Sequence, residues 1–423
     1  MFTSTRRAFL GLAATGLGLT RASAAEDGSN TMTERTMVTA RDYLAKLLYT
    51  RKEVDEWFAG KAFPFSKHDP ELGWLLRDAR FADGMDGIVC TYRYGPHDER
   101  VMLTHADRPC RVNTYGDSFT QCHQVSDGET WQEILAAHMG EPVRNFGVGG
   151  WSVYQAYLRM KREEARLPAG LLILNIWDDD HYRNLDAWRN IRTHKHPQHI
   201  ESTLPHLKVD FATGDCVEMP NPCPSQADYY HLCDLDWVEN RFGDDFVLGI
   251  MLAHTNSKEG NPALAYEAIL DLATTHGIET RLDRSMTASA LASELFTKAA
   301  LQSSMYVVDR VEQFARTHGK KVLYVLSYSA GNIAKRLERG TRFDQPFVDF
   351  LQERGLPVVD LMEAHATDYA DFSCGIQNYL KRYYIGHYNS WGDFFTAMAL
   401  RESVMNMLDP KPAPMLPPSW TKG

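Results

Sequence analysis

The sequence predicts an α/β protein, a three-layer α/β/α sandwich in which helices cover both faces of a central parallel sheet. Two observations lead to this fold class. Short apolar segments typical of buried strands alternate with amphipathic helical segments from residue 110 to about residue 408. In addition, 44% of the 423 residues are hydrophobic and 11% are aromatic, so the chain can bury a large core.

Residues 1–24 are expected to be an export signal that is not part of the fold. Arg6 and Arg7 precede an apolar run of about a dozen residues, and residues 22–24 (Ala-Ser-Ala) form a small-residue cleavage site. The run is too short and too rich in glycine to be a permanent membrane anchor. The paired arginines resemble a twin-arginine signal, which implies the twin-arginine export machinery as a partner and a periplasmic or secreted location.

Residues 25–109 are expected to form an N-terminal extension that packs on the main domain. The stretch from Thr33 to about Phe58 has a helical, amphipathic pattern, and residues 63–84 have the character of loops and short strands. At the other end of the chain, residues 409–423 form a proline-rich tail.

The main domain, residues 110–408, contains the alternating segments in order. Ser126 and Glu129 are spaced as a capping box for the first helix, and Gly140 is its stop signal. The expected strands are residues 110–115, 142–147, 170–177, 319–329 and 355–362, and the clearest helices are residues 126–140, 152–167 and 391–408. Residues 185–261 interrupt this order and are expected to be an insertion, which either shapes a substrate cleft or is a purely structural flap.

The net charge and the cysteine spacing argue against several functional classes of protein. The formal net charge of −10 argues against nucleic acid or an anionic membrane as a partner, because both need clustered Lys and Arg. Seven cysteines with no C-x-x-C pair indicate neither a zinc ribbon nor a disulfide framework, so buried free thiols are expected. Oxidation of one pair among Cys216, Cys223 and Cys233 remains an alternative.

Three short blocks point to chemistry at strand ends. "YGDSFTQ" places Ser118 after the first strand, "NFGVGGWS" places Gly150 after the second, and "IGHYNSWG" places His387 before the last helix. Together these blocks resemble the SGNH, or GDSL, serine hydrolases. The resemblance implies a flavodoxin-like fold and hydrolysis of an ester without a cofactor or metal. It also implies Ser118 as nucleophile, His387 as base, and the Ser118 and Gly150 amides as oxyanion donors.

The residue types suit that chemistry. A serine hydroxyl is a weak nucleophile and needs an adjacent base, usually histidine, to take its proton. A tetrahedral oxyanion needs donors that already point at it, and backbone N–H groups at a glycine turn leave room for the substrate.

The family's oxyanion asparagine is absent from its expected place, which Asp179 occupies. An ionised aspartate cannot donate a hydrogen bond. Either burial keeps Asp179 protonated, so that it can donate, or the donor lies elsewhere, with Asn184 and Asn175 as candidates.

The family's triad acid is absent as well. It usually lies two or three residues before the histidine, where this chain has Ile385 and Tyr384. Since the acid holds the imidazole tautomer and stabilises its cation, another group can replace it. Either a backbone carbonyl orients His387, or a distant carboxylate does, with Asp360, Asp368 and Asp371 as candidates.

Alternatives remain for both the nucleophile and the activity. Ser329 in "SYSAG" lies one residue away from matching the G-x-S-x-G elbow of α/β-hydrolases. The same Ser118 site would also serve an O-acyltransferase, and a non-catalytic glycan-binding protein is a third reading. The resemblance and the expected export favour a small-molecule or glycan ester as substrate, with acetyl groups on carbohydrate as one case.

Overall fold

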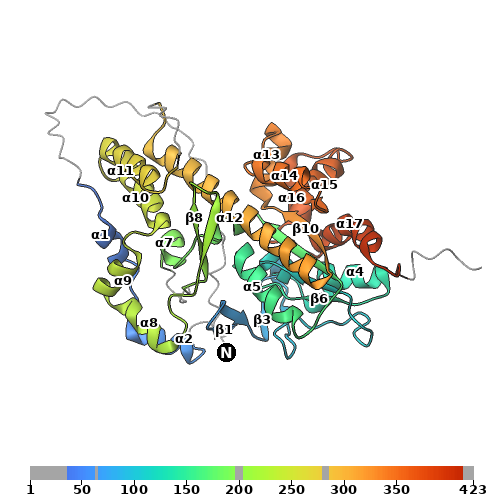
Figure 1. The fold of residues 1–423 in the computed structure, drawn as a ribbon. Coiled ribbons are helices and arrows are strands. Elements are labelled where there is room, and N and C mark those ends of the chain that lie inside the picture. Colours follow the sequence, from blue (N-terminus) through green and yellow to red (C-terminus); the bar gives the residue numbers. More distant parts are fainter. Residues whose placement is uncertain (1–35, 62–64, 196–202, 279–284, 413–423) are drawn as a thin grey trace, which may run out of the picture.

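The computed structural model describes residues 36–61, 65–195, 203–278 and 285–412. The expected export signal and most of the proline-rich tail lie outside the described residues. The chain forms two hydrophobic cores, one around a parallel sheet and one among helices (Figure 1). The long helix α12 (Ala288–His318) contributes buried side chains to both.

The sheet has five parallel strands in the order β11-β10-β7-β5-β6. The central strands β7 and β10 are almost entirely buried, as expected for strands covered on both faces. Renumbered by position in the chain, this is the doubly wound order 2-1-3-4-5, in which ligands bind at the carboxyl ends of the strands. The predicted fold class is confirmed. The strands are β5 (Val112–Tyr115), β6 (Val143–Asn145), β7 (Leu171–Trp177), β10 (Lys321–Ser327) and β11 (Val358–Asp360).

Helices cover the sheet in two layers. α4 packs on α17 in one layer, and α5 packs on α12 in the other. The helices of this half besides α12 are α3 (Ser118–Gln121), α4 (Trp131–Met139), α5 (Val153–Glu164), α13 (Ala330–Arg339), α14 (Gln345–Glu353), α15 (Leu361–Tyr369), α16 (Ile376–Tyr383) and α17 (Ser390–Met407).

The predicted capping box forms, but not on the helix for which it was expected. Ser126 and Glu129 cap a 3-10 turn, whereas α4 begins after its own N-cap, Thr130. Gly140 ends α4 in the left-handed conformation, with φ 73°, as predicted.

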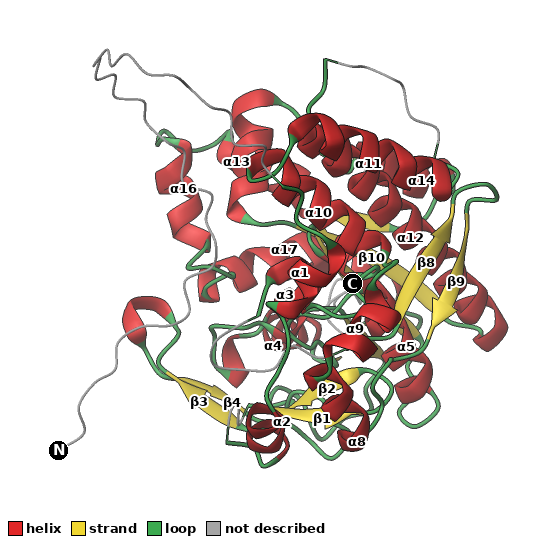
Figure 2. Cartoon of the chain, turned by 90° about the vertical axis from the view of Figure 1, so that its left-hand side faces the viewer, coloured by secondary structure: helices red, strands yellow, loops and turns green. Residues whose placement is uncertain are grey.

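The second core gathers segments from distant parts of the sequence. It lies among α1 (Ala40–Ala45), α2 (Arg51–Phe58), α7 (Asn190–Thr193), α8 (Gln226–Tyr229), α9 (Leu235–Phe242), α10 (Phe246–Lys258), α11 (Pro262–Thr275) and the first part of α12. It therefore extends beyond residue 261, the expected end of the insertion. The hairpin of β8 (His206–Asp210) and β9 (Asp215–Met219) lies along α12 (Figure 2).

The N-terminal extension is divided between the two cores. α1 and α2 belong to the helical core, whereas the antiparallel hairpins that follow contribute Leu75 and Tyr92 to the core around the sheet. The hairpin strands are β1 (Ser66–Asp69), β2 (Gly73–Leu76), β3 (Ala79–Phe81) and β4 (Cys90–Tyr92).

Two further findings concern the whole described chain. All seven cysteines are free thiols. None of the helices within the described ranges is long and apolar enough to cross a membrane.

Candidate functional site

Ser118 is the first residue of α3, directly beyond the carboxyl end of β5. The tight turn between strand and helix depends on Gly116, whose φ is 153°. A Cβ atom there would lie 2.2 Å from Thr120 Oγ1 and 2.7 Å from the Asn175 carbonyl oxygen. Asp117 caps α3 by accepting from Phe119 N–H at 2.9 Å. The turn therefore fixes Ser118 at the edge of the sheet where ligands bind in this fold.

His387 lies between α16 and α17, and its ring reaches Ser118. His387 Nε2 is 2.8 Å from Ser118 Oγ, although the two residues are 269 positions apart in the sequence. Phe119 packs against the His387 ring, with centroids 5.2 Å apart. A serine hydroxyl hydrogen-bonded to an imidazole is the arrangement that nucleophilic catalysis needs.

The loop after β6 brings backbone amides next to Ser118. A Cβ atom on Gly149 would lie 3.6 Å from Ser118 Cβ, so this loop directly adjoins the serine. Gly149 N–H donates to Gln121 Oε1 at 2.9 Å, and Gly149 O accepts from Trp74 Nε1 at 3.2 Å. These bonds fix the peptide that precedes Gly150, the residue expected to supply an oxyanion donor. Gly150 has φ 81°, which a residue with a side chain rarely adopts.

The expectation of a protonated, donating Asp179 is wrong. Asp179 Oδ1 lies 2.9 Å from Arg192 Nη1, and its Oδ2 lies 2.9 Å from Arg183 Nε. Burial alone would raise its pKa, but the charges of Arg192 and Arg183 lower the pKa of Asp179 to about 2. Asp179 is thus a carboxylate that accepts from two guanidinium groups and has no proton to donate.

Of the two alternative oxyanion donors, Asn184 already uses its side-chain amide in other hydrogen bonds. The Asn184 side-chain amide donates to Ser303 and Ser304, at 3.1 and 2.9 Å, and its oxygen accepts from Tyr154 N–H. Asn184 is therefore part of the buried contact with α12. Asn175 is a buried residue inside β7.

A cluster of buried charged side chains adjoins Ser118. Arg183 Nη1 lies 2.8 Å from Asp180 Oδ1 and 3.5 Å from Asp117 Oδ2. Burial raises the pKa of both carboxyl groups. Asp117 Oδ2 is also 3.1 Å from Ser118 Oγ, so the serine hydroxyl lies between a carboxyl group and the His387 ring.

None of the candidate carboxylates holds His387. Asp360 caps α15 and pairs with Arg342, Asp368 accepts from Tyr379 and Tyr383, and Asp371 is exposed. Within the described ranges, the His387 ring is hydrogen-bonded to Ser118 and Gln124 and to no carboxylate. The expectation that Asp360 or Asp371 is the triad acid is therefore wrong.

The side chain of Gln124 lies at the far side of the His387 ring from Ser118. Its Oε1 lies 3.2 Å from His387 Nδ1 and accepts from His387 N–H at 2.8 Å. The backbone of Gln124 is left-handed, with φ 77°, and so is that of Cys122, with φ 59°. Nothing in the sequence pattern singled out Gln124, because a glutamine in a loop has no characteristic spacing.

The loop that carries Gln124 is held by a buried arginine. Arg100, with 2% of its surface exposed, donates to the carbonyl oxygens of Gln121, Cys122 and Val125 at 2.5 to 2.7 Å. Asp127 balances its charge, with Oδ1 3.2 Å from Arg100 Nε. Three carbonyls bound by one side chain fix the unusual backbone of this loop.

The rival serine has a structural role. Ser329 caps α13, and its hydroxyl donates to Asp178 Oδ2 at 2.7 Å. Asn332 Nδ2 also donates to this carboxylate. Among its hydrogen-bond partners in the described chain there is no histidine, so Ser329 lacks the base that a nucleophile needs.

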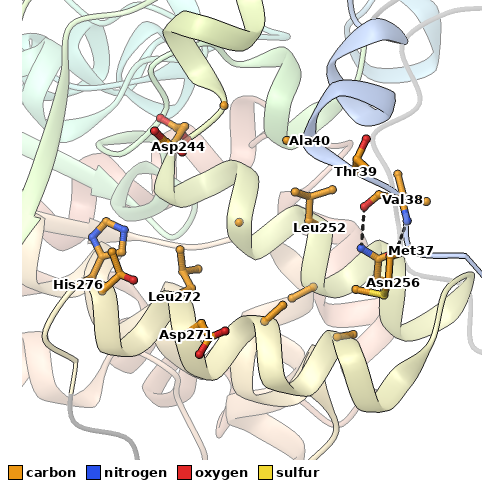
Figure 3. A pocket seen from close by; sticks show the side chains of 17 residues that line it. Met37, Val38, Thr39, Ala40, Asp244, Leu252, Asn256, Asp271, Leu272 and His276 are labelled. Carbon is orange, nitrogen blue, oxygen red and sulfur yellow. Dashed lines mark hydrogen bonds between the residues drawn. The ribbon is translucent and has the colours of Figure 1, made fainter.

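A cavity of about 610 Å³ lies in the helical core, away from these residues (Figure 3). It is lined by the segment before α1 and by α10 and α11, and at one end Asn256 Nδ2 donates to Val38 O at 3.0 Å. Its lining contains neither Ser118 nor His387. No group of three or more His, Cys, Asp or Glu side chains among the described residues is arranged to hold a metal ion.

Comparison with known proteins leaves the family open. No family model and no curated protein matches the chain. Among solved structures, the acetyl xylan esterase AlAXEase is 13% identical, with a TM-score of 0.32, over 69% of this chain and 98% of that chain. A putative lipolytic protein of the G-D-S-L family from Desulfitobacterium hafniense DCB-2 is 11% identical, with a TM-score of 0.29, over 71% of this chain and 100% of that chain.

Proposed function

We propose that the protein is a serine esterase of the SGNH type. The observation that carries the proposal is the hydrogen bond of 2.8 Å between Ser118 Oγ and His387 Nε2, at the carboxyl edge of a parallel sheet. His387 takes the Ser118 proton as Oγ attacks the ester carbonyl carbon, and the amides of Ser118 and Gly150 bind the oxyanion. His387 then gives the proton to the departing alcohol.

The second half of the reaction uses the same groups. His387 takes a proton from a water molecule, which attacks the acyl carbon bound to Ser118 Oγ. The serine leaves with the proton that His387 returns, and the carboxylic acid is released. Both steps need neutral His387, and burial and the nearby His123 and Arg183 lower the pKa of His387.

The proposal extends to location and substrate class. The export signal expected in residues 1–24 favours action in the periplasm or outside the cell. Esters available there include O-acyl groups on carbohydrate, so we propose a glycan ester or a small ester as the substrate.

The test compares the two serines. Purified Ser118→Ala is expected to lose hydrolysis of an aryl acetate and labelling by a fluorophosphonate, whereas Ser329→Ala retains both. Peptide mapping of the labelled wild-type protein is expected to find the probe on Ser118. Labelling on Ser329, or no labelling of the folded protein, would refute the proposal.

A further inference from the structure

The feature that extends the proposed function is the side-chain amide of Gln124. Its nitrogen donates to the Asp83 carbonyl oxygen at 2.9 Å, and its oxygen faces His387. The backbone N–H of His387 can only donate, and the carbonyl of Asp83 can only accept. The amide therefore has one possible orientation, with Oε1 toward His387.

This orientation decides which nitrogen of the His387 ring carries the proton. Since Gln124 Oε1 has no proton, His387 Nδ1 must be the donor across their 3.2 Å contact. Nε2 of the neutral ring is then unprotonated and can accept the Ser118 Oγ proton across 2.8 Å. The same single proton can instead point to Asp117 Oδ2, 3.1 Å away, so the serine donates to one of these two acceptors at a time. Protonation of the ring at Nδ1 gives the tautomer a general base needs, and in a triad the carboxylate selects it.

The other surroundings of the ring hold it in this position. His123 stacks on His387, with centroids 5.0 Å apart and planes 7° apart. His123 Nε2 lies 3.0 Å from Asp83 Oδ2, and Tyr92 donates to the same oxygen at 2.8 Å. Tyr92 Oη also accepts from Gln124 N–H at 2.8 Å. The segment around Asp83 thus anchors both the amide and the stacked ring.

We propose that Gln124, anchored on Asp83, replaces the triad acid as the group that positions His387. Gln124 acts through His387 and does not touch the ester, so it is a positioning residue. As a neutral amide it selects the tautomer through its dipole, without placing a full charge beside the ring.

The test uses two substitutions at one position. Gln124→Met has nearly the same length but no acceptor, and Gln124→Glu keeps an acceptor and adds a charge. Both keep a side chain at φ 77°, so backbone strain is matched. The charged or titratable groups that face the ring, Asp117, His123 and Arg183, are the same in both.

We expect kcat on an aryl acetate to fall about a hundredfold in Gln124→Met, with KM changed less than about twofold. The kcat of Gln124→Glu is expected to be at least about tenfold higher than that of Gln124→Met. The added negative charge favours the imidazolium, so the acid limb of kcat/KM moves to higher pH by about one unit. A residue with a merely structural role would not move that limb.

The kinetic measurements depend on the proposed esterase function. A spectroscopic measurement therefore tests the role of Gln124 separately from the esterase function. Nitrogen NMR of histidine-labelled protein is expected to show His387 protonated at Nδ1 in the wild type and a mixture of tautomers in Gln124→Met. The opposite tautomer in the wild type, or kcat of Gln124→Met within about threefold of wild type, overturns the role of Gln124. Absence of hydrolysis and of Ser118 labelling in the wild type overturns the esterase proposal, while the tautomer result still decides the role of Gln124.

Discussion

Replacing Arg100 with methionine tests whether one buried guanidinium holds the loop that faces His387. The change removes the donors of three carbonyl oxygens, those of Gln121, Cys122 and Val125. Each buried carbonyl left without a partner costs about 1–3 kcal/mol. Removing one member of a buried ion pair typically costs about 3–5 kcal/mol in total. We therefore expect the free energy of unfolding to fall by at least about 3 kcal/mol.

The measurement is urea unfolding of the two proteins, followed by circular dichroism. Arg93→Met is the matched control, because Arg93 binds the same Asp127 carboxylate at 2.7 Å, but its side chain is 50% exposed. Its loss is expected to cost much less than the loss of Arg100, because solvent screens an exposed ion pair. Equal effects of the two substitutions would show that the buried carbonyl contacts of Arg100 contribute nothing beyond a surface ion pair.

Two further predictions concern pH and Asp179. Burial, His123 and Arg183 lower the pKa of His387, so the base stays neutral in more acidic solution. The acid limb of the kcat/KM profile is therefore expected below the ordinary imidazole pKa of about 6.5. A pH–rate profile with its acid limb at or above that value would contradict this expectation. Asp179→Asn is expected to lower the free energy of unfolding by about 1–2 kcal/mol at neutral pH, since the carboxylate pairs with Arg183 and Arg192. The lowered pKa of Asp179 means that its contribution is present above about pH 4 and is lost as the pH falls toward 2. The deficit should therefore shrink over that range in acid unfolding curves, and a deficit independent of pH would count against the ion pairs.

The parts of the fold that the sequence predicts are those set by local patterns. Continuous apolar runs such as that of β7 mark central parallel strands, and the residues after them must lie at one edge of the sheet. The meeting of Ser118 with the loop before Gly150 follows from that rule. The second core does not follow from any local pattern, because it combines α1 and α2 with helices more than a hundred residues later.

The environment of Asp179 and the partner of His387 illustrate what local patterns miss. Arg183 lies four residues after Asp179, a spacing that favours an ion pair on a helix, and this was the available indication that Asp179 is ionised. Gln124 had no comparable indication. Its position depends on two left-handed residues and on Arg100, which comes from a segment more than twenty residues earlier.

The helix α12 limits how the protein can be divided. Its 31 residues span about 46 Å. Its buried hydrophobic side chains up to Ala300 lie in the helical core, and those from Leu301 onward lie in the core around the sheet. Cutting the chain before residue 110 would remove α1 and α2 from one core and Tyr92 from the other. The strands β10 and β11 follow α12, so a fragment that keeps the whole sheet also keeps this helix. Hydrogen exchange along α12 should consequently be slow in both halves and should rise together in denaturant, as for a single cooperative unit.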